Sequence, residues 1–142
     1  MNKKKILVLF AEILYLFLIG FFCYTSINKL MNLDSFRTNL LKTTLFTEKF
    51  ANYLSIIVVM SEIILIVIML FRKKTGLLLI AILIFIFTIY ISYLKFNGLY
   101  EVCGCGGVLN GLSYYRHLFI NIFLVCSSTI SYFILKHFEN EK

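Results

Sequence analysis

The sequence contains no proline and few charged residues, and both absences restrict the class of protein that it encodes. Charged residues make up only 15% of the 142 residues, whereas 61% are hydrophobic. A soluble domain of this length could not cover so much apolar surface. We also find no internal repeat and no low-complexity linker. Residues 1–142 are therefore predicted to form a single membrane domain.

Acidic residues are scarce as well, which leaves a formal net charge of +7. The basic residues do not form one continuous patch, so nucleic acid is excluded as a partner. They stand instead at the ends of apolar runs, where Lys and Arg side chains reach lipid headgroups. We therefore expect these basic side chains to interact with the lipid bilayer.

Four apolar runs cover about residues 6–24, 52–71, 76–96 and 117–135. Each approaches or exceeds the roughly 18 apolar residues that mark a membrane-spanning helix. The first run is longer than a signal-peptide core, contains Glu12 and ends without a small-residue cleavage site, so we expect it to be retained. The predicted fold is an all-α integral membrane protein, a four-helix up-down-up-down bundle.

The short basic turn Arg72-Lys73-Lys74 between the second and third runs indicates the orientation. Basic residues in short loops favour the cytoplasmic side. With this turn and both termini in the cytoplasm, eight basic residues lie inside and six outside. We expect a multi-pass protein of the bacterial cytoplasmic (inner) membrane, with the loop between the third and fourth runs on the extracytoplasmic side.

The long first loop, about residues 25–51, is predicted to contain an interfacial helix on the same outer side. Its apolar residues are spaced like the buried face of a helix lying along the membrane surface. These residues are Phe36, Leu40, Leu41 and Leu45. Asp34 or Ser35 is expected to cap the start of this helix.

Two ionisable residues lie within the spans, Glu12 in the first and Glu62 in the second. A buried charge in a membrane helix is costly, so each is a candidate functional residue. Glu62 is also compatible with a protonated, hydrogen-bonded strut between helices. For Glu12 the structural interpretation is favoured, because it lies in the cytoplasmic half of its span.

The third and fourth spans carry polar stripes that are expected to face the bundle interior, since lipid cannot satisfy them. His117, Asn121 and Ser128 share one face of the fourth span. Thr88 and Ser92 form a comparable stripe on the third span. Cys126 follows His117 by nine residues, about 180° around a helix, so it should face lipid or plain packing.

The stretch Glu101-Val102-Cys103-Gly104-Cys105-Gly106-Gly107 places two thiols one residue apart in the outer loop. Disulfides persist outside the cytoplasm. A disulfide between two cysteines one residue apart closes a very short ring, which is strained even though Gly104 eases the strain. A strained disulfide exchanges readily with other thiols. The basic start of the fourth span, with Arg116 and His117, would favour a thiolate.

A reversible redox pair is therefore the first interpretation of Cys103 and Cys105, and a structural disulfide is the second. A metal site is a third, but Cys103, Cys105 and His117 supply only three good ligands without the usual cysteine spacing, so no metal is predicted. Cys23, near the outer end of the first span, is the natural third cysteine to relay electrons, or else a small packing residue.

Five segments of the chain, SINKL, SFRTNL, SEIIL, CGCGG and RHLFIN, together resemble the MauE/DoxX-like redox-associated membrane proteins. The resemblance covers nearly the whole chain. The matching residues are Lys29, Glu62, Cys103, Cys105, His117 and Asn121. The sequence departs from the family pattern in two places. It lacks the proline that often precedes the span-two glutamate, and Gly-Gly stands where a phenylalanine often follows the cysteine pair.

The resemblance implies a part in extracytoplasmic disulfide chemistry, beside a thioredoxin-like protein or a cysteine-containing secreted client. MauE itself is needed to mature the disulfide-rich subunit of methylamine dehydrogenase. The chain is also similar to quinone-linked disulfide-forming bundles. Those bundles use two cysteine pairs, and only one is clear here. No cofactor is predicted: a quinone is compatible with the resemblance, but no sequence feature supports one.

Three functional hypotheses remain at this point. The first is a membrane thiol–disulfide oxidoreductase that acts through Cys103 and Cys105. The second is a non-enzymatic accessory, such as a chaperone, an immunity-type protein or a small-ligand binder, whose Cys-Gly-Cys disulfide is structural. The third is a solute carrier built around Glu62, for which four short helices leave little room.

Overall fold

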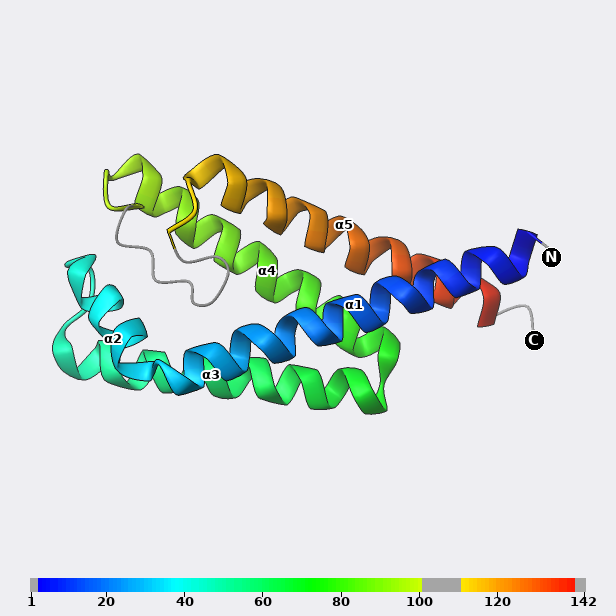
Figure 1. The fold of residues 1–142 in the computed structure, drawn as a ribbon, viewed down its shortest axis with the longest axis horizontal. Helices are drawn as coiled ribbons and strands as arrows, with labels where there is room; N and C mark the ends of the chain where they lie inside the picture. Colours follow the sequence, from blue (N-terminus) through cyan, green and yellow to red (C-terminus); the bar gives the residue numbers. More distant parts are fainter. Residues whose placement is uncertain (1–2, 101–110, 140–142) are drawn as a thin grey trace.

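The computed structural model describes residues 3–100 and 111–139, and these residues form five α-helices. The helices are α1 (Lys3–Met31), α2 (Leu33–Lys42), α3 (Glu48–Phe71), α4 (Lys73–Phe96) and α5 (Tyr114–Glu139). All except α2 are long and apolar enough to cross a membrane. These four run alternately up and down along one bundle axis (Figure 1). The predicted four-helix membrane bundle is confirmed.

The four long helices form a ring in which each helix packs against two others. Helix α5 lies between α1 and α4, and α3 closes the ring by contacting both of them. The start of α1, the end of α5 and the α3–α4 turn lie at one end of the bundle, which we call the terminal end (Figure 1). Helix α2 packs on α3 at the opposite end, the α2 end, where α4 finishes and α5 begins.

Apolar side chains fill the bundle and also cover its outside. The central cluster consists of Tyr15, Leu18, Phe22, Ile66, Met69, Leu77, Ile80, Ile84 and Leu124. On the outer surface, Leu16, Ile57 and Phe119 have 63%, 61% and 72% of their areas exposed. In water such a surface would be unfavourable, whereas in a bilayer it contacts lipid chains. The fold is therefore that of a multi-pass membrane protein.

Near the terminal end, α3 and α4 approach so closely that only glycine fits at the contact. A Cβ atom on Gly76 would lie 2.5 Å from the Cα atom of Met69. Two side chains donate hydrogen bonds to backbone oxygens around this contact. Tyr15 Oη donates to the Met69 oxygen at 2.8 Å, and Ser128 Oγ donates to the oxygen of Leu77. These bonds connect α1 to α3 and α5 to α4, close to the α3–α4 turn.

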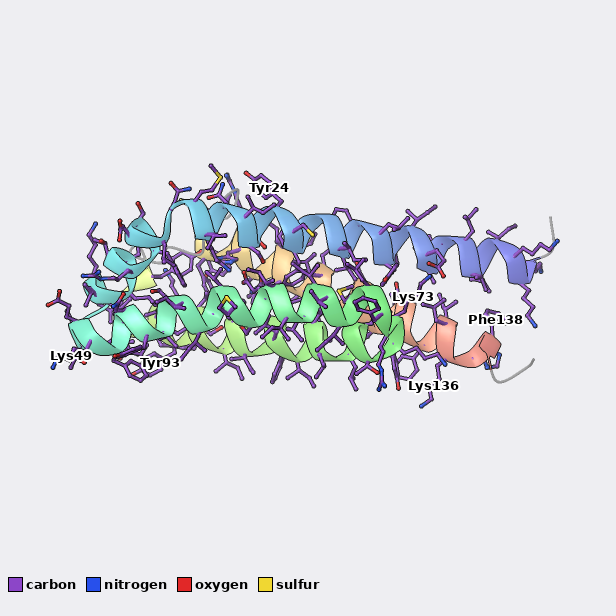
Figure 2. All side chains as sticks on the ribbon, turned by 90° about the horizontal axis from the view of Figure 1, so that it is seen from below. Tyr24, Lys49, Lys73, Tyr93, Lys136 and Phe138 are labelled. Carbon is purple, nitrogen blue, oxygen red and sulfur yellow. The ribbon has the colours of Figure 1, made fainter. Side chains whose placement is uncertain are left out.

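The terminal end also carries basic side chains, among them the labelled Lys73 and Lys136, whereas Lys49 lies at the α2 end (Figure 2). Lys73 Nζ donates to both carboxylate oxygens of Glu12, at 2.9 and 2.8 Å. Both side chains are partly exposed. Glu12 thus forms a peripheral link between α1 and α4.

Three details of the predicted α2 end are wrong. Helix α1 continues to Met31 instead of ending at residue 24, so part of the expected loop is helical. The interfacial helix is present as α2, but its N-cap is Asn32, not Asp34 or Ser35, and no side chain caps it. The Asn32 side chain donates instead to the Asn28 oxygen at 3.0 Å. Leu40 is buried as expected, whereas Leu45 lies beyond the helix and is 39% exposed.

Candidate functional site

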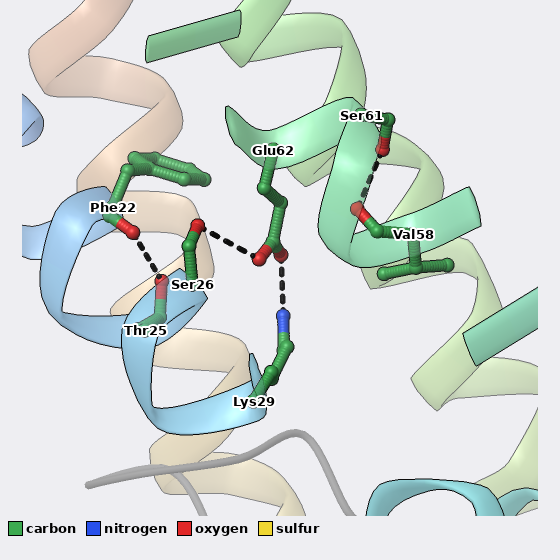
Figure 3. A network of polar contacts seen from close by, with 7 residues as sticks. All are labelled: Phe22, Thr25, Ser26, Lys29, Val58, Ser61 and Glu62. Carbon is green, nitrogen blue, oxygen red and sulfur yellow. Dashed lines mark hydrogen bonds and ion pairs between the residues drawn. The ribbon is translucent and has the colours of Figure 1, made fainter. Parts of the chain in front are cut away.

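Glu62 lies on the inner face of α3, with only 1% of its area exposed, and its carboxylate points at α1 (Figure 3). Lys29 Nζ donates to one carboxylate oxygen, Oε1. Ser26 Oγ donates to the other, Oε2, at 3.1 Å. Both oxygens of Glu62 therefore have partners from α1, and the charge of the carboxylate is balanced inside the bundle.

The local sequence of α1 explains how these partners are presented. Ser26 and Lys29 are three residues apart, so they lie on one face of the helix. Lys29 Nζ also lies 5.2 Å from the ring centre of Phe87 on α4 and 5.8 Å from that of Phe36 on α2. An ammonium above an aromatic face is attracted by the ring. Lys29 thus joins the helices α1, α2, α3 and α4.

A second polar group lies at the start of α5, where His117 is 3% exposed. Tyr100 Oη donates to the Leu112 oxygen at 3.0 Å and lies 3.2 Å from His117 Nδ1. A phenol has one proton, so both contacts are satisfied when His117 Nδ1–H donates to Tyr100. That tautomer makes Nε2 the acceptor of the imidazole ring. Burial, and then the neighbouring Tyr114, raise the pKa of Tyr100, which keeps its proton bound at neutral pH.

One turn further along α5, Asn121 links this helix to α4. Its Nδ2 donates to Thr88 Oγ1 at 3.1 Å, and Thr88 donates to the Ile84 oxygen at 2.8 Å. Ser92 and Tyr114 lie 3.1 Å apart, oxygen to oxygen. The polar stripes predicted on these two helices face each other and the bundle interior, as expected.

Lys29, Glu62, His117 and Asn121 line one cavity of about 230 Å³ in the α2 half of the bundle. All five helices contribute to its wall. The remaining lining residues are almost all apolar, and five of them are aromatic: Phe21, Phe22, Phe36, Phe87 and Tyr90. The structure therefore brings together four of the residues that the sequence predicted for a site.

The cysteines are distributed differently. Cys103 and Cys105 lie outside the described residues, so the predicted pair is not part of this geometry. Cys23 is partly buried on α1 and packs against the apolar cluster. Cys126 is exposed on the outer face of α5, as predicted from its angle to His117. Within residues 3–100 and 111–139, no three His, Cys, Asp or Glu side chains are grouped as a metal site.

A family model described as methylamine utilisation protein MauE matches residues 7–134. The chain belongs to the MauE family. The match reaches into all four spanning helices and includes the cavity residues and the Cys-Gly-Cys segment, and it confirms the resemblance found in the sequence. No curated protein and no solved structure matches the chain.

Sequence reasoning missed two contributors to the site of this MauE-family protein. Ser26 was assigned to a loop, although its spacing from Lys29 would have placed both on one helical face. Tyr100 carried no signal in the sequence beyond its position just before the Cys-Gly-Cys segment. Its contacts with Leu112 and His117 join residues 12 and 17 positions away.

Proposed function

We propose that this MauE-family membrane protein is a thiol–disulfide redox protein that acts through Cys103 and Cys105. Its reaction partner would be an extracytoplasmic thioredoxin-like protein or a cysteine-containing client, in a maturation role like the one that the family resemblance implies. The observation that carries the proposal is the contact of Tyr100 with Leu112 and His117. It joins the two chain ends that flank the Cys-Gly-Cys segment.

The chain connection limits how far the cysteine pair can lie from these groups. Cys103 follows Tyr100 by three residues. Three residues span at most about 11 Å, so the Cα atoms of Tyr100 and Cys103 cannot be further apart. The His117 imidazole, which is bonded to Tyr100, is therefore a candidate to accept or return a thiol proton. An imidazole that takes the proton of a neighbouring thiol becomes a cation, and the cation favours the reactive thiolate.

The proposed exchange conserves atoms and electrons without any further reagent. A thiolate of a reduced partner attacks one sulfur of the Cys103–Cys105 disulfide, forming a mixed disulfide and releasing the other cysteine as a thiolate. The second thiol of the partner then attacks the mixed disulfide. The partner leaves oxidised, and Cys103 and Cys105 are left as two thiols. A thioredoxin-like protein in its disulfide form would restore the pair by the reverse steps.

One observation favours the accessory hypothesis instead. Both carboxylate oxygens of Glu62 are occupied by Ser26 and Lys29, which is what a purely structural link between α1 and α3 requires. In that case the Cys-Gly-Cys disulfide would be a structural staple. The two hypotheses differ in whether either cysteine is attacked by an outside thiolate.

Trapping of the mixed disulfide tests the proposal. In Cys103→Ser or Cys105→Ser, the remaining cysteine cannot be released by its neighbour, so one variant should accumulate a reductant-sensitive covalent complex. Cys126→Ser is the matched control, because Cys126 faces outward and should behave as the wild type. If neither variant traps a partner while both fold and support the function of the host, the accessory hypothesis replaces the proposal.

A further inference from the structure

The cavity in the α2 half of the bundle has a volume of about 230 Å³. A cavity of about 150 Å³ lined by Leu, Ile and Phe is known to stay dry and to bind benzene. The cavity here is larger, and its wall is likewise dominated by aliphatic and aromatic side chains. It therefore has room for a substituted ring.

One part of the cavity wall is polar, and its chemistry determines which substituent a bound ring would carry. Lys29 is 6% exposed and lines the cavity. An ammonium has three N–H groups. In the described part of the chain, one of them is directed to Glu62, while the rings of Phe36 and Phe87 lie within 6 Å of the charge. A ligand oxygen would be a stronger acceptor for this ammonium than a ring face.

The position of the cavity indicates how a ligand would enter. Ile86 lines the cavity and is nevertheless 54% exposed on α4. The cavity wall therefore includes a residue of the surface that faces lipid. A compound dissolved in the bilayer would reach it without crossing water, since the spanning helices are surrounded by lipid.

We propose that this cavity binds a lipid-soluble ring compound bearing a carbonyl-type oxygen, with the ring among the aromatic side chains and the oxygen directed at Lys29. The pocket combines an apolar wall with a few convergent polar groups, as small-molecule sites usually do. Binding of this kind goes beyond the proposed cysteine chemistry and does not depend on it.

A matched pair of probes tests both parts of the proposal, the binding of the ring and the preference for a ring that carries an oxygen. Tetramethyl-1,4-benzoquinone and 1,2,4,5-tetramethylbenzene share a six-membered carbon ring with four methyl groups. The quinone carries two carbonyl oxygens at the ring positions where the hydrocarbon carries two hydrogens. Their saturable binding to the full chain in lipid nanodiscs is compared with empty nanodiscs. The quinone should bind at least ten-fold more tightly than the hydrocarbon. Equal affinities would show that the polar wall selects nothing and would overturn the proposal.

Variants locate the binding. Val58→Phe fills the cavity from α3, whereas Ile57→Phe adds a larger side chain to the neighbouring outward position, which is 61% exposed. The first should weaken quinone binding at least ten-fold and the second should not; if Val58→Phe does not fold, Leu54→Phe replaces it. Unchanged binding in a folded cavity-filling variant, or full displacement of the quinone by palmitate, would contradict the proposal. Because trapping at Cys103 or Cys105 is measured separately, either proposal can fail alone.

Discussion

Lys29 in the last turns of α1 and Glu62 in α3 form a buried ion pair, although they are 33 residues apart in the sequence. A charge inside a membrane bundle is stable only with such a partner. The pair fixes the α2 end of α1 against α3 and contributes to the wall of the cavity. Variants of this ion pair can therefore show whether Lys29 and Glu62 contribute to stability alone or also to function.

Replacing one member of this pair should strongly destabilise the protein. In Glu62→Gln, the Lys29 ammonium stays buried without a counter-charge, which we expect to cost about 3–5 kcal/mol. The double variant Lys29→Met with Glu62→Leu removes both charges and should recover most of the loss, because apolar replacement of a whole buried pair is often tolerated. Unfolding of the purified variants in detergent micelles measures both.

The activity of the double variant then distinguishes a structural pair from a functional one. If the pair takes part in function, the double variant should be folded but inactive in client maturation. A folded and fully active double variant would show that Lys29 and Glu62 only hold helices together. Equal stability of Glu62→Gln and the wild type would contradict the buried ion pair itself.

The same pair shows why the sequence predicted the bundle well but the end of α1 poorly. Apolar runs indicate helices that contact lipid, and the four spanning helices were predicted from such runs. The polar residues from Thr25 onward resemble a loop because their partner, Glu62, lies in another helix. Likewise, Asn32 takes the N-cap position because α1 runs on to Met31 and supplies the Asn28 oxygen for its side chain. The inward direction of His117 and Asn121 followed from helical angles alone. The contact of Tyr100 with His117 could not be predicted in this way, because it depends on how the tertiary fold brings distant parts of the sequence together.

Gly76→Ala should destabilise the α3–α4 contact. The added methyl group would lie 2.5 Å from the Met69 Cα, a backbone atom that cannot move independently, so we expect a loss of about 1–3 kcal/mol. Gly20→Ala is the matched control, because nothing lies within 4 Å of a Cβ atom there. In α1 that change should be neutral or stabilising by up to about 1 kcal/mol. Comparable losses at both positions in thermal unfolding would refute the close approach.

Tyr100→Phe should remove the bond to Leu112 and leave His117 Nδ1 without its partner, at a cost of about 1 kcal/mol. The folded-state pKa of Tyr100 is raised above the ordinary value of 10.0, so this contribution is fully present below pH 10 and is lost only as the pH rises through the raised pKa. The difference from the wild type should therefore be constant between pH 6 and 9. Tyr115→Phe, at a 75% exposed side chain, is the control. A difference that vanishes within this pH range would contradict the assignment.

Cys103 and Cys105 should be accessible from outside the cell. The basic turn that contains Lys73 lies at the terminal end, opposite the end where α4 finishes and α5 begins (Figure 1). A cytoplasmic basic turn therefore puts the Cys-Gly-Cys segment on the other side. A membrane-impermeant thiol reagent should label the reduced pair in intact spheroplasts of a Cys23→Ser, Cys126→Ser variant. Labelling that requires permeabilised membranes would reverse the orientation.

The redox potential of the Cys103–Cys105 pair tests the central claim most directly. It is measured by equilibrating the Cys23→Ser, Cys126→Ser variant in nanodiscs with glutathione buffers and counting alkylated thiols. A pair that exchanges disulfides should titrate above the roughly −300 mV below which structural disulfides lie. His117→Ala should move the alkylation profile of the reduced pair to higher pH. A pair that glutathione cannot reduce, with an alkylation profile unaffected by His117→Ala, would contradict the account and identify the disulfide as structural.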